Sequence, residues 1–159
     1  MKIDILAVGR IKESYLRDAV DEYVKRLSSY VKLNIIEVKD EKAVEGASDH
    51  ANDLVKASEA KRLASHITDT AVLIPLCIEG REMSSEEFAD MITSFENSGK
   101  SHIQFVIGGS LGIDEALKKK GNVALSFSKM TFPHQLMRVV LLEQIYRAYR
   151  IKNNEPYHK

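Results

Sequence analysis

The chain has 159 residues, of which 44% are hydrophobic, 29% charged and 7% aromatic, with no Trp and a single cysteine, Cys77. This length predicts one domain, residues 1–159, with an ordinary buried core. One cysteine excludes an internal disulfide framework and a zinc cluster of several thiolates. No apolar run approaches the ~20 residues of a membrane span, so we expect a cytoplasmic protein without a membrane partner.

Charge is unevenly distributed, although the 23 basic and 23 acidic residues cancel overall. Residues 1–116 carry 14 Lys and Arg against 21 Asp and Glu, whereas residues 117–159 carry nine against two. Such an excess of basic residues at one end is typical of a surface that faces a polyanion. A solvated basic helix would give the same count, so charge alone leaves both interpretations open.

Apolar strands alternate with amphipathic helices from the N-terminus onward. The first eight residues indicate a strand rather than a signal peptide. Further strands are expected at 33–38, 71–78, 103–107 and 123–126, and helices at 13–28, 48–67, 84–98, 114–120 and 133–153. Ser84 and Glu87 predict a capping box, Glu79-Gly80 a strand end, and Pro133 the first helical position of the last helix. The alternation predicts an α/β domain with a mostly parallel sheet flanked by helices.

Three loops that follow strands are expected to line one site. In a parallel sheet, ligands bind outside the carboxyl ends of the strands, which places loops 76–80, 108–111 and 127–132 together. Their apolar and backbone-rich composition suits an adenosine-like ligand. The glycine-rich loop 108–112 lacks the dinucleotide and P-loop patterns, so on its own it is as consistent with a simple turn. The chain also lacks a nucleophile elbow, which disfavours a hydrolase, and Cys77 is interpreted as a core residue.

The last predicted helix is apolar almost all round its axis. A helix of this kind must be buried on every side, and a second subunit would achieve this at the edge of a small domain. We therefore expect a two-fold homodimer through this helix. The alternative is a central helix wrapped by its own chain.

Polar residues on this helix and in the tail suggest RNA chemistry. Glu143 and Arg147 have the favourable i, i+4 spacing, and Arg150 lies beside them. The chain ends on Tyr157, His158 and Lys159. A surface ion pair and a frayed tail would explain these residues equally well. Together they would also suit phosphate contact, base stacking and proton handling.

Three C-terminal segments resemble a known family. They are Leu125-Ser-Phe-Ser-Lys-Met-Thr-Phe-Pro-His134, Glu143-Gln-Ile-Tyr-Arg-Ala148 and Pro156-Tyr-His-Lys159, supported by Ile107-Gly-Gly109 and Ala7-Val-Gly9. The chain is similar over its whole length to the ribosomal RNA large subunit methyltransferase H family. These SPOUT-class enzymes methylate N3 of a pseudouridine in 23S rRNA. Cys77 departs from the family pattern, in which an acidic residue often stands at that position.

The resemblance implies a trefoil-knotted C-terminal region that holds S-adenosyl-L-methionine, with no metal. It also implies a homodimer whose site is completed by the partner's tail, acting on 23S rRNA within the ribosome. The implied cofactor contacts are Leu76, Gly108, Phe127, Ser128, Lys129, Met130, Thr131 and Phe132. The implied catalytic residues are His158, Glu143, Arg147 and Tyr157.

Among these residues, we expect His158 to act as the base, with Glu143 as the alternative. We expect Arg147 to orient the nucleotide and Tyr157 to stack on it. A non-catalytic RNA- or nucleotide-binding module is the competing hypothesis. That module would bind RNA whether or not S-adenosylmethionine is present.

Overall fold

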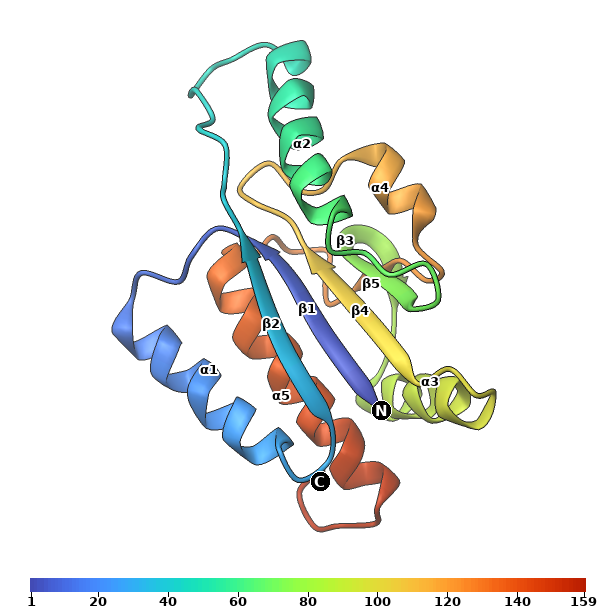
Figure 1. The fold of residues 1–159 in the computed structure, drawn as a ribbon. Helices are drawn as coiled ribbons and strands as arrows, with labels where there is room; N and C mark the ends of the chain where they lie inside the picture. Colours follow the sequence, from blue (N-terminus) through green and yellow to red (C-terminus); the bar gives the residue numbers. More distant parts are fainter.

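Five strands and five helices alternate along the chain, which the computed structural model describes from residue 1 to residue 159 (Figure 1). The strands are β1 (Lys2–Val8), β2 (Lys32–Val38), β3 (Val72–Glu82), β4 (His102–Ile107) and β5 (Leu125–Ser126). The helices are α1 (Ser14–Leu27), α2 (Asp49–Ala64), α3 (Ser85–Asn97), α4 (Glu115–Lys120) and α5 (His134–Lys152). Every pair of neighbouring strands is parallel, in the order β2-β1-β4-β3-β5. The predicted α/β class with a parallel sheet is confirmed.

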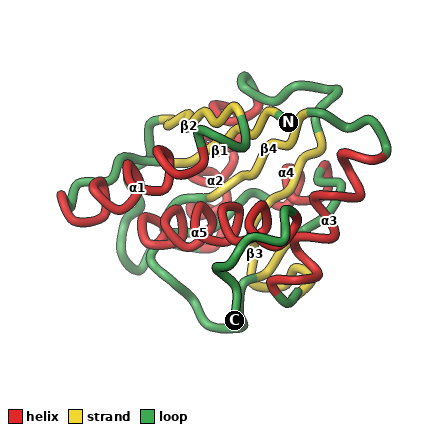
Figure 2. Tube along the Cα trace, turned by 90° about the horizontal axis from the view of Figure 1, so that it is seen from below, coloured by secondary structure: helices red, strands yellow, loops and turns green.

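Helices cover both faces of the sheet because side chains alternate along each strand. On β1, Ile3 and Ile5 belong to the larger core, which packs against α1, α3 and α5. Leu6 and Val8 belong to the smaller core, which includes Leu63 of α2 and residues of α4. Figure 2 shows α1, α5 and α3 along one side of the strands. A sheet covered on both faces explains why its central strands are apolar throughout.

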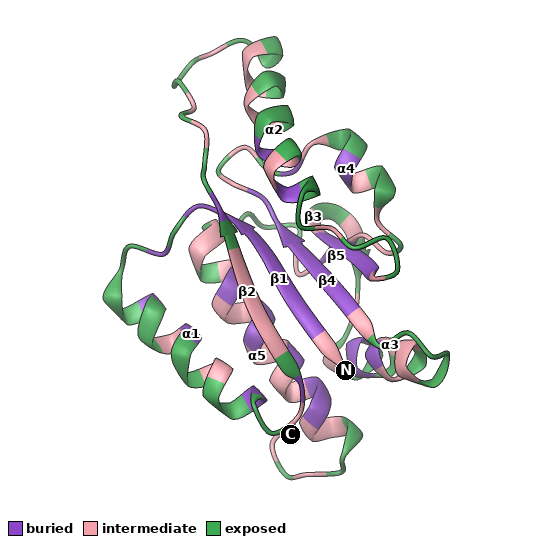
Figure 3. Ribbon diagram, viewed as in Figure 1, coloured by how far each residue is buried: buried purple, intermediate pink, exposed green.

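Burial falls from the centre of the sheet to its edge (Figure 3). β1 and β4 are buried over almost their whole length, whereas the edge strand β2 is mostly half-buried. The carboxyl ends of β1 and β4 therefore meet in the interior of the fold. The loops that leave them have a rigid base.

Local signals predicted most element ends, with two corrections. The capping box of Ser84 and Glu87 is present, with both reciprocal hydrogen bonds. Gly80 does not end β3, which continues to Glu82. A Cβ on Gly80 would lie 2.7 Å from the backbone carbon of Leu125, so the glycine allows β5 to approach β3 closely. Pro133 is the N-cap residue of α5 and not its first helical residue.

A buried arginine fixes α5 against the edge of the sheet where the strands end. The Arg138 side chain is 1% exposed and donates to the carboxylate of Glu37 at 2.6 Å. It also donates to the carbonyl oxygens of Val8 at 3.0 Å and Gly9 at 2.7 Å. These carbonyls belong to the end of β1 and the turn after it. The first turns of α5 are therefore held beside the carboxyl ends of the strands.

A polar network occupies the opposite, amino-terminal end of the sheet. Asp4 is 2% exposed, and its carboxylate accepts from Asn34 at 2.8 Å and Gln104 at 3.0 Å and contacts His102 at 2.7 Å. Burial by itself raises the pKa of Asp4, but the hydrogen bonds from Asn34, His102 and Gln104 outweigh it and leave that pKa lowered. The folded protein thus favours the ionised form of Asp4.

The lowered pKa makes stability depend on pH in a defined direction. A carboxyl whose pKa is lower in the folded state stabilises the fold above its unfolded pKa of about 4 and loses this contribution as pH falls further. We expect Asp4→Asn to lower the free energy of unfolding at pH 7 by more than it does at pH 3. Urea denaturation at both pH values measures the difference. Asp18→Asn, at an exposed position, is the control and should change neither value. A penalty for Asp4→Asn that is equal at both pH values would contradict this role.

Candidate active site

A cavity of about 670 Å³ lies at the carboxyl ends of β4 and β5, beside the middle of β3. Its walls come from residues 76–79, 107–113, 125–128 and 130–134, with Lys118 and Met137. These segments include most of the three stretches that were expected to line one site. The expectation of a loop at 76–80 was wrong, because these residues belong to β3, which continues to Glu82. The volume is within the range of small-molecule sites, and apolar side chains make up half of the lining residues.

The residues that the resemblance assigned to a cofactor converge on this cavity with one exception. The lining includes Leu76, Gly108, Phe127, Ser128, Met130, Thr131 and Phe132. Lys129 is exposed and is not part of the wall. Its side chain is therefore placed outside the cavity, although both of its neighbours in the chain line it.

The glycine-rich loop is closed tightly on itself. A Cβ on Gly108 would lie 2.6 Å from the backbone carbon of Gly112, which is closer than real Cβ atoms come to such a neighbour. The backbones of Gly109 and Gly112 form an isolated bridge, and Gly112 has a positive φ of 87°. The missing side chain of Gly108 therefore makes room for the backbone of the loop itself.

Hydroxyl groups shape the wall formed by the segment after β5. Ser126 donates to the carbonyl oxygen of Ser128 at 3.1 Å, and the hydroxyl of Ser128 accepts from the amide of Met130 at 3.0 Å. These bonds turn the segment after β5 over the cavity, where Met130 and Phe132 remain 73% and 39% exposed. The cavity therefore has a rigid floor of strand ends and an exposed apolar rim.

The titratable groups of the cavity are poor nucleophiles. Burial raises the pKa of the Cys77 thiol, which keeps it protonated at neutral pH. Burial, and then the charge of Arg138, lowers the pKa of His134, so its imidazole is neutral at pH 7. Glu79 and Lys118 pair with each other at the rim. These groups can bind and orient a ligand, and none is arranged to attack one.

A second cluster brings together the four predicted catalytic residues. Glu143 accepts from the Arg147 guanidinium at 2.5 and 3.0 Å and from the Tyr157 hydroxyl at 3.1 Å. Nδ1 of His158 lies 3.3 Å from Arg147, and its Nε2 lies 2.7 Å from the carboxylate of Glu86 at the start of α3. The predicted Glu143–Arg147 pair is therefore present, and the tail is placed directly against it.

The tail is folded back onto its own protomer and does not extend away from it. The Tyr157 ring packs edge-on against Tyr146, with 4.9 Å between ring centroids, and lies beneath the Arg147 guanidinium. Burial, hydrogen bonding to Tyr23 and the nearby Glu143 raise the pKa of Tyr157 to about 12, so its hydroxyl stays protonated. Glu155 pairs with Arg150, which leaves the expected Glu143–Arg147–Arg150 stripe divided into two ion pairs. These contacts disfavour the alternative of a frayed tail.

The cavity and the catalytic cluster lie at opposite ends of α5. His134 lines the cavity at the start of this helix, and Arg147 lies thirteen residues further along it. At 1.5 Å per residue this separation is about 20 Å along the helix axis. Figure 1 shows the tail beside the far end of α5, away from the carboxyl ends of the strands. Within one protomer, the cavity and the cluster of predicted catalytic residues are therefore separate.

Sequence reasoning missed Glu86 and Tyr146 as neighbours of the tail. Glu86 stands two residues after the cap Ser84, where an acidic side chain suits the helix dipole, and this offers no hint of a contact with His158. Tyr146 was counted only as part of the apolar surface of the last helix. No local pattern distinguishes either residue, because both contacts join distant parts of the chain.

Comparison with known proteins agrees with the observed fold and identifies the family of the chain. A family model described as "Predicted SPOUT methyltransferase" matches residues 1–158. The solved structure of a probable methylase family protein from Haemophilus influenzae Rd KW20 aligns with 99% of this chain and 70% of its own, at a TM-score of 0.54 and 12% identity. At that identity the likeness concerns the fold alone. The chain belongs to the SPOUT methyltransferase family.

Closer relatives share the whole length of the chain. Proteins named ribosomal RNA large subunit methyltransferase H are 58% identical in Bifidobacterium adolescentis, 56% in Bifidobacterium animalis subsp. lactis and 54% in Clostridium botulinum. Each alignment covers 100% of this chain and 100% of the relative. The resemblance noted in the sequence is therefore confirmed. None of the helices combines the length and apolar composition needed to cross a lipid bilayer.

Proposed function

We propose that this protein transfers a methyl group from S-adenosyl-L-methionine to N3 of a pseudouridine in 23S rRNA, within ribosomal particles of the cytoplasm. The observation that carries the proposal is the cavity of about 670 Å³ at the carboxyl ends of β4 and β5, beside the middle of β3, in a SPOUT-family chain. Its apolar walls and exposed main chain suit an adenosine moiety. The names of the full-length relatives support ribosomal RNA as the substrate.

The residues of the cavity would hold the cofactor and exclude water. Leu76, Gly108 and the segment 127–132 would bind it. Within that segment, Lys129 would contribute only its main chain, because its side chain lies outside the cavity. When bound, the sulfonium supplies the electrophilic methyl group. The protein must then place the acceptor nitrogen in line and accept its imide proton.

The cluster around Glu143 would place the acceptor nucleotide and accept its imide proton. His158 has one ring nitrogen 3.3 Å from Arg147 and the other 2.7 Å from Glu86, so the imidazole is held in a fixed orientation. An imidazole suits proton transfer near neutral pH, which makes His158 the proposed base. Glu143, which accepts from Arg147 and Tyr157, is the alternative base. Arg147 would orient the nucleotide, and Tyr157 would stack against it.

The separation of the two clusters supports a homodimer with composite sites. Because about 20 Å of α5 lies between them, a protomer cannot close its own tail over its own cavity without unfolding these contacts. α5 buries one face in its own core, at Leu141, Leu142 and Ile145, and leaves Leu136 36% exposed near the cavity rim. Within one protomer the helix is therefore not buried on every side, and a second subunit would cover the remaining apolar surface.

The same region would contain the trefoil knot that the resemblance implies. β5 follows β4 in the chain but pairs with β3, and its following segment crosses the cavity before α5 begins. The knot stays a prediction of the family resemblance.

Calorimetric titration with S-adenosylmethionine tests the proposed function without knowledge of the RNA. We expect one binding site per chain, and methyl transfer from labelled cofactor to ribosomal particles that lack the modification. The enzyme should prefer these particles to naked rRNA, because its formal net charge is zero and electrostatic attraction is weak outside the basic end. RNA binding that is indifferent to the cofactor, with no heat of cofactor binding, would indicate the non-catalytic module instead.

A further inference from the structure

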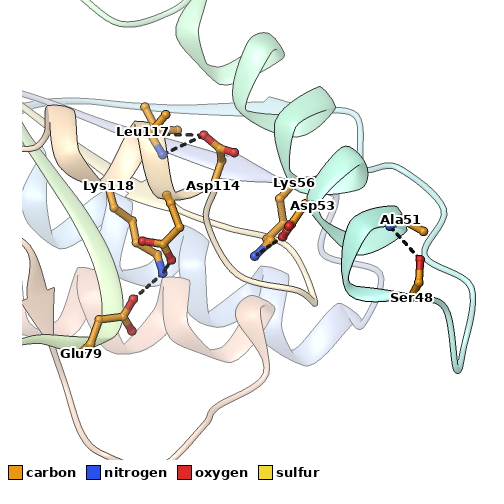
Figure 4. Close-up of polar contacts among 10 residues, drawn as sticks. Ser48, Ala51, Asp53, Lys56, Glu79, Asp114, Leu117 and Lys118 are labelled. Atoms are coloured by element: carbon orange, nitrogen blue, oxygen red, sulfur yellow. Dashed lines mark hydrogen bonds and ion pairs between the residues drawn. The ribbon is translucent and has the colours of Figure 1, made fainter.

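Only one carboxylate and one ammonium group line the proposed cofactor cavity. They are Glu79, in the second half of β3, and Lys118 of α4, and their charged groups contact each other (Figure 4). The remaining lining residues are apolar or neutral, with His134 neutral at pH 7 as described above. This ion pair is the only charged feature of a cavity whose other lining residues are uncharged.

The position of Lys118 is fixed by the helix that carries it. Asp114 caps α4 by accepting from the amides of Ala116 at 3.1 Å and Leu117 at 3.3 Å, and Leu117 is 4% exposed in the smaller core. Nζ of Lys118 also donates to Glu115 at 2.9 Å. The Lys118 side chain is only 17% exposed, whereas that of Glu79 is 61% exposed. Lys118 therefore acts as an anchor, and Glu79 is the member that faces the open side.

The Glu79–Lys118 pair leaves one hydrogen-bond acceptor and one donor unused. Lys118 contacts one carboxylate oxygen of Glu79, and the other has no side-chain partner. An ammonium group has three donors, and two of those of Lys118 are used by Glu79 and Glu115. The hydrogen bond from Lys118 lowers the pKa of Glu79, so the carboxylate is ionised and purely an acceptor at neutral pH. The rim thus offers a free acceptor beside a free donor.

A vicinal diol matches this arrangement better than a cation does. Each hydroxyl of a diol donates one hydrogen and accepts others, so it can satisfy both the carboxylate and the ammonium. A cationic group brought to Glu79 would face the charge of Lys118 at close range. An apolar group would leave both charges desolvated and unsatisfied.

We propose that Glu79 binds the ribose hydroxyls of S-adenosylmethionine, with Lys118 as the residue that positions its carboxylate. This assignment rests on the proposed function, and it names the part of the cofactor that the rim recognises. Ribose is the only vicinal diol of that cofactor. Glu79 is then a determinant of selectivity for ribosides over deoxyribosides.

The test measures binding by calorimetry for the wild type and Glu79→Ala. The ligands are S-adenosylhomocysteine, its 2′,3′-dideoxy analogue and 5′-methylthioadenosine, which lacks the amino-acid portion. Because a hydrogen bond to a charged group is lost, we expect Glu79→Ala to weaken binding of the two ribosides by about 10- to 100-fold. The dideoxy analogue should bind the wild type and the variant equally. Glu115→Ala is the matched control, since Glu115 contacts the same Lys118 without lining the cavity.

Each other outcome contradicts the assignment in a recognisable way. If Glu79→Ala loses affinity for S-adenosylhomocysteine but not for methylthioadenosine, Glu79 binds the ammonium group of the amino acid instead of the ribose. Equal affinity of the wild type and Glu79→Ala for every ligand would show that the rim pair binds nothing. If the wild type itself binds no S-adenosylhomocysteine, the proposed function fails along with this assignment. Thermal unfolding monitored by circular dichroism should be nearly unchanged in both variants, because both carboxylates are exposed.

Discussion

Replacing His158 with Ala lowers the rate of methyl transfer to ribosomal particles by about 10²- to 10⁴-fold, if the imidazole accepts the imide proton. The variant should bind S-adenosylmethionine as the wild type does, because His158 lies at the opposite end of α5 from the cavity. Removal of residues 157–159 should have at least the same effect on rate. It should leave the fold intact, since the pair of Glu155 with Arg150 remains.

Controls separate the loss of a base from a loss of structure. His50→Ala changes an exposed histidine on α2 and should leave the rate unchanged. Glu86→Gln keeps an acceptor for His158 but removes the charge, so we expect a smaller decrease than for His158→Ala. A decrease of only a few-fold for His158→Ala, with the pH dependence of the rate unaltered, would transfer the role of base to Glu143 or to water. Full activity of the truncated enzyme would contradict the participation of the tail altogether.

Replacing Gly108 with Ala should weaken binding of S-adenosylhomocysteine by about tenfold or more and lower methyl transfer by about 10²-fold. The added Cβ would meet the backbone carbon and oxygen of Gly112 at 2.6 and 2.7 Å, and backbone cannot rotate away as a side chain can. The loop must therefore open, which displaces the wall of the cavity. A displacement of about 1 Å in a positioning element is enough for a loss of this size.

The matched control for this variant is Gly46→Ala. Gly46 lies in the loop before α2, and a Cβ there would have no neighbour within 4 Å. Its φ of 73° makes the substitution locally strained, so a small loss of stability is expected without an effect on binding. Far-ultraviolet circular dichroism should show that both variants keep the α/β fold. Unchanged affinity of a folded Gly108→Ala variant would show that the glycine-rich loop does not form the cofactor wall.

Local patterns in the sequence predicted the elements because the forces that define them are local. The capping box of Ser84 and Glu87 and the i, i+4 pair of Glu143 and Arg147 both involve residues within one helical turn. The rule that ligands bind at the carboxyl ends of parallel strands was enough to bring three distant segments to one cavity, although residues 76–79 lie within β3 and not in a loop after it. These inferences needed only spacing and strand direction.

Contacts between distant residues could not be predicted in the same way. Arg138 is buried because its guanidinium satisfies the carbonyls of Val8 and Gly9, and nothing around position 138 indicates that partner. Gly80 resembles a strand end in the sequence, whereas its real constraint is the backbone of β5. The separation of the cavity from the catalytic cluster likewise became visible only once α5 had been placed.

Mixed dimers test most directly whether the active site is shared between subunits. Gly108→Ala disables the cavity and His158→Ala disables the tail, so each variant alone should be nearly inactive. Random mixing by co-refolding places one chain of each kind in half of the dimers. Each mixed dimer of two-fold symmetry then contains one fully intact composite site, which predicts recovery of about a quarter of the wild-type methyl-transfer rate. Recovery to that level would support a site built from one subunit's cavity and its partner's tail. No recovery, with mixed dimers shown to be present by mass spectrometry, would contradict it.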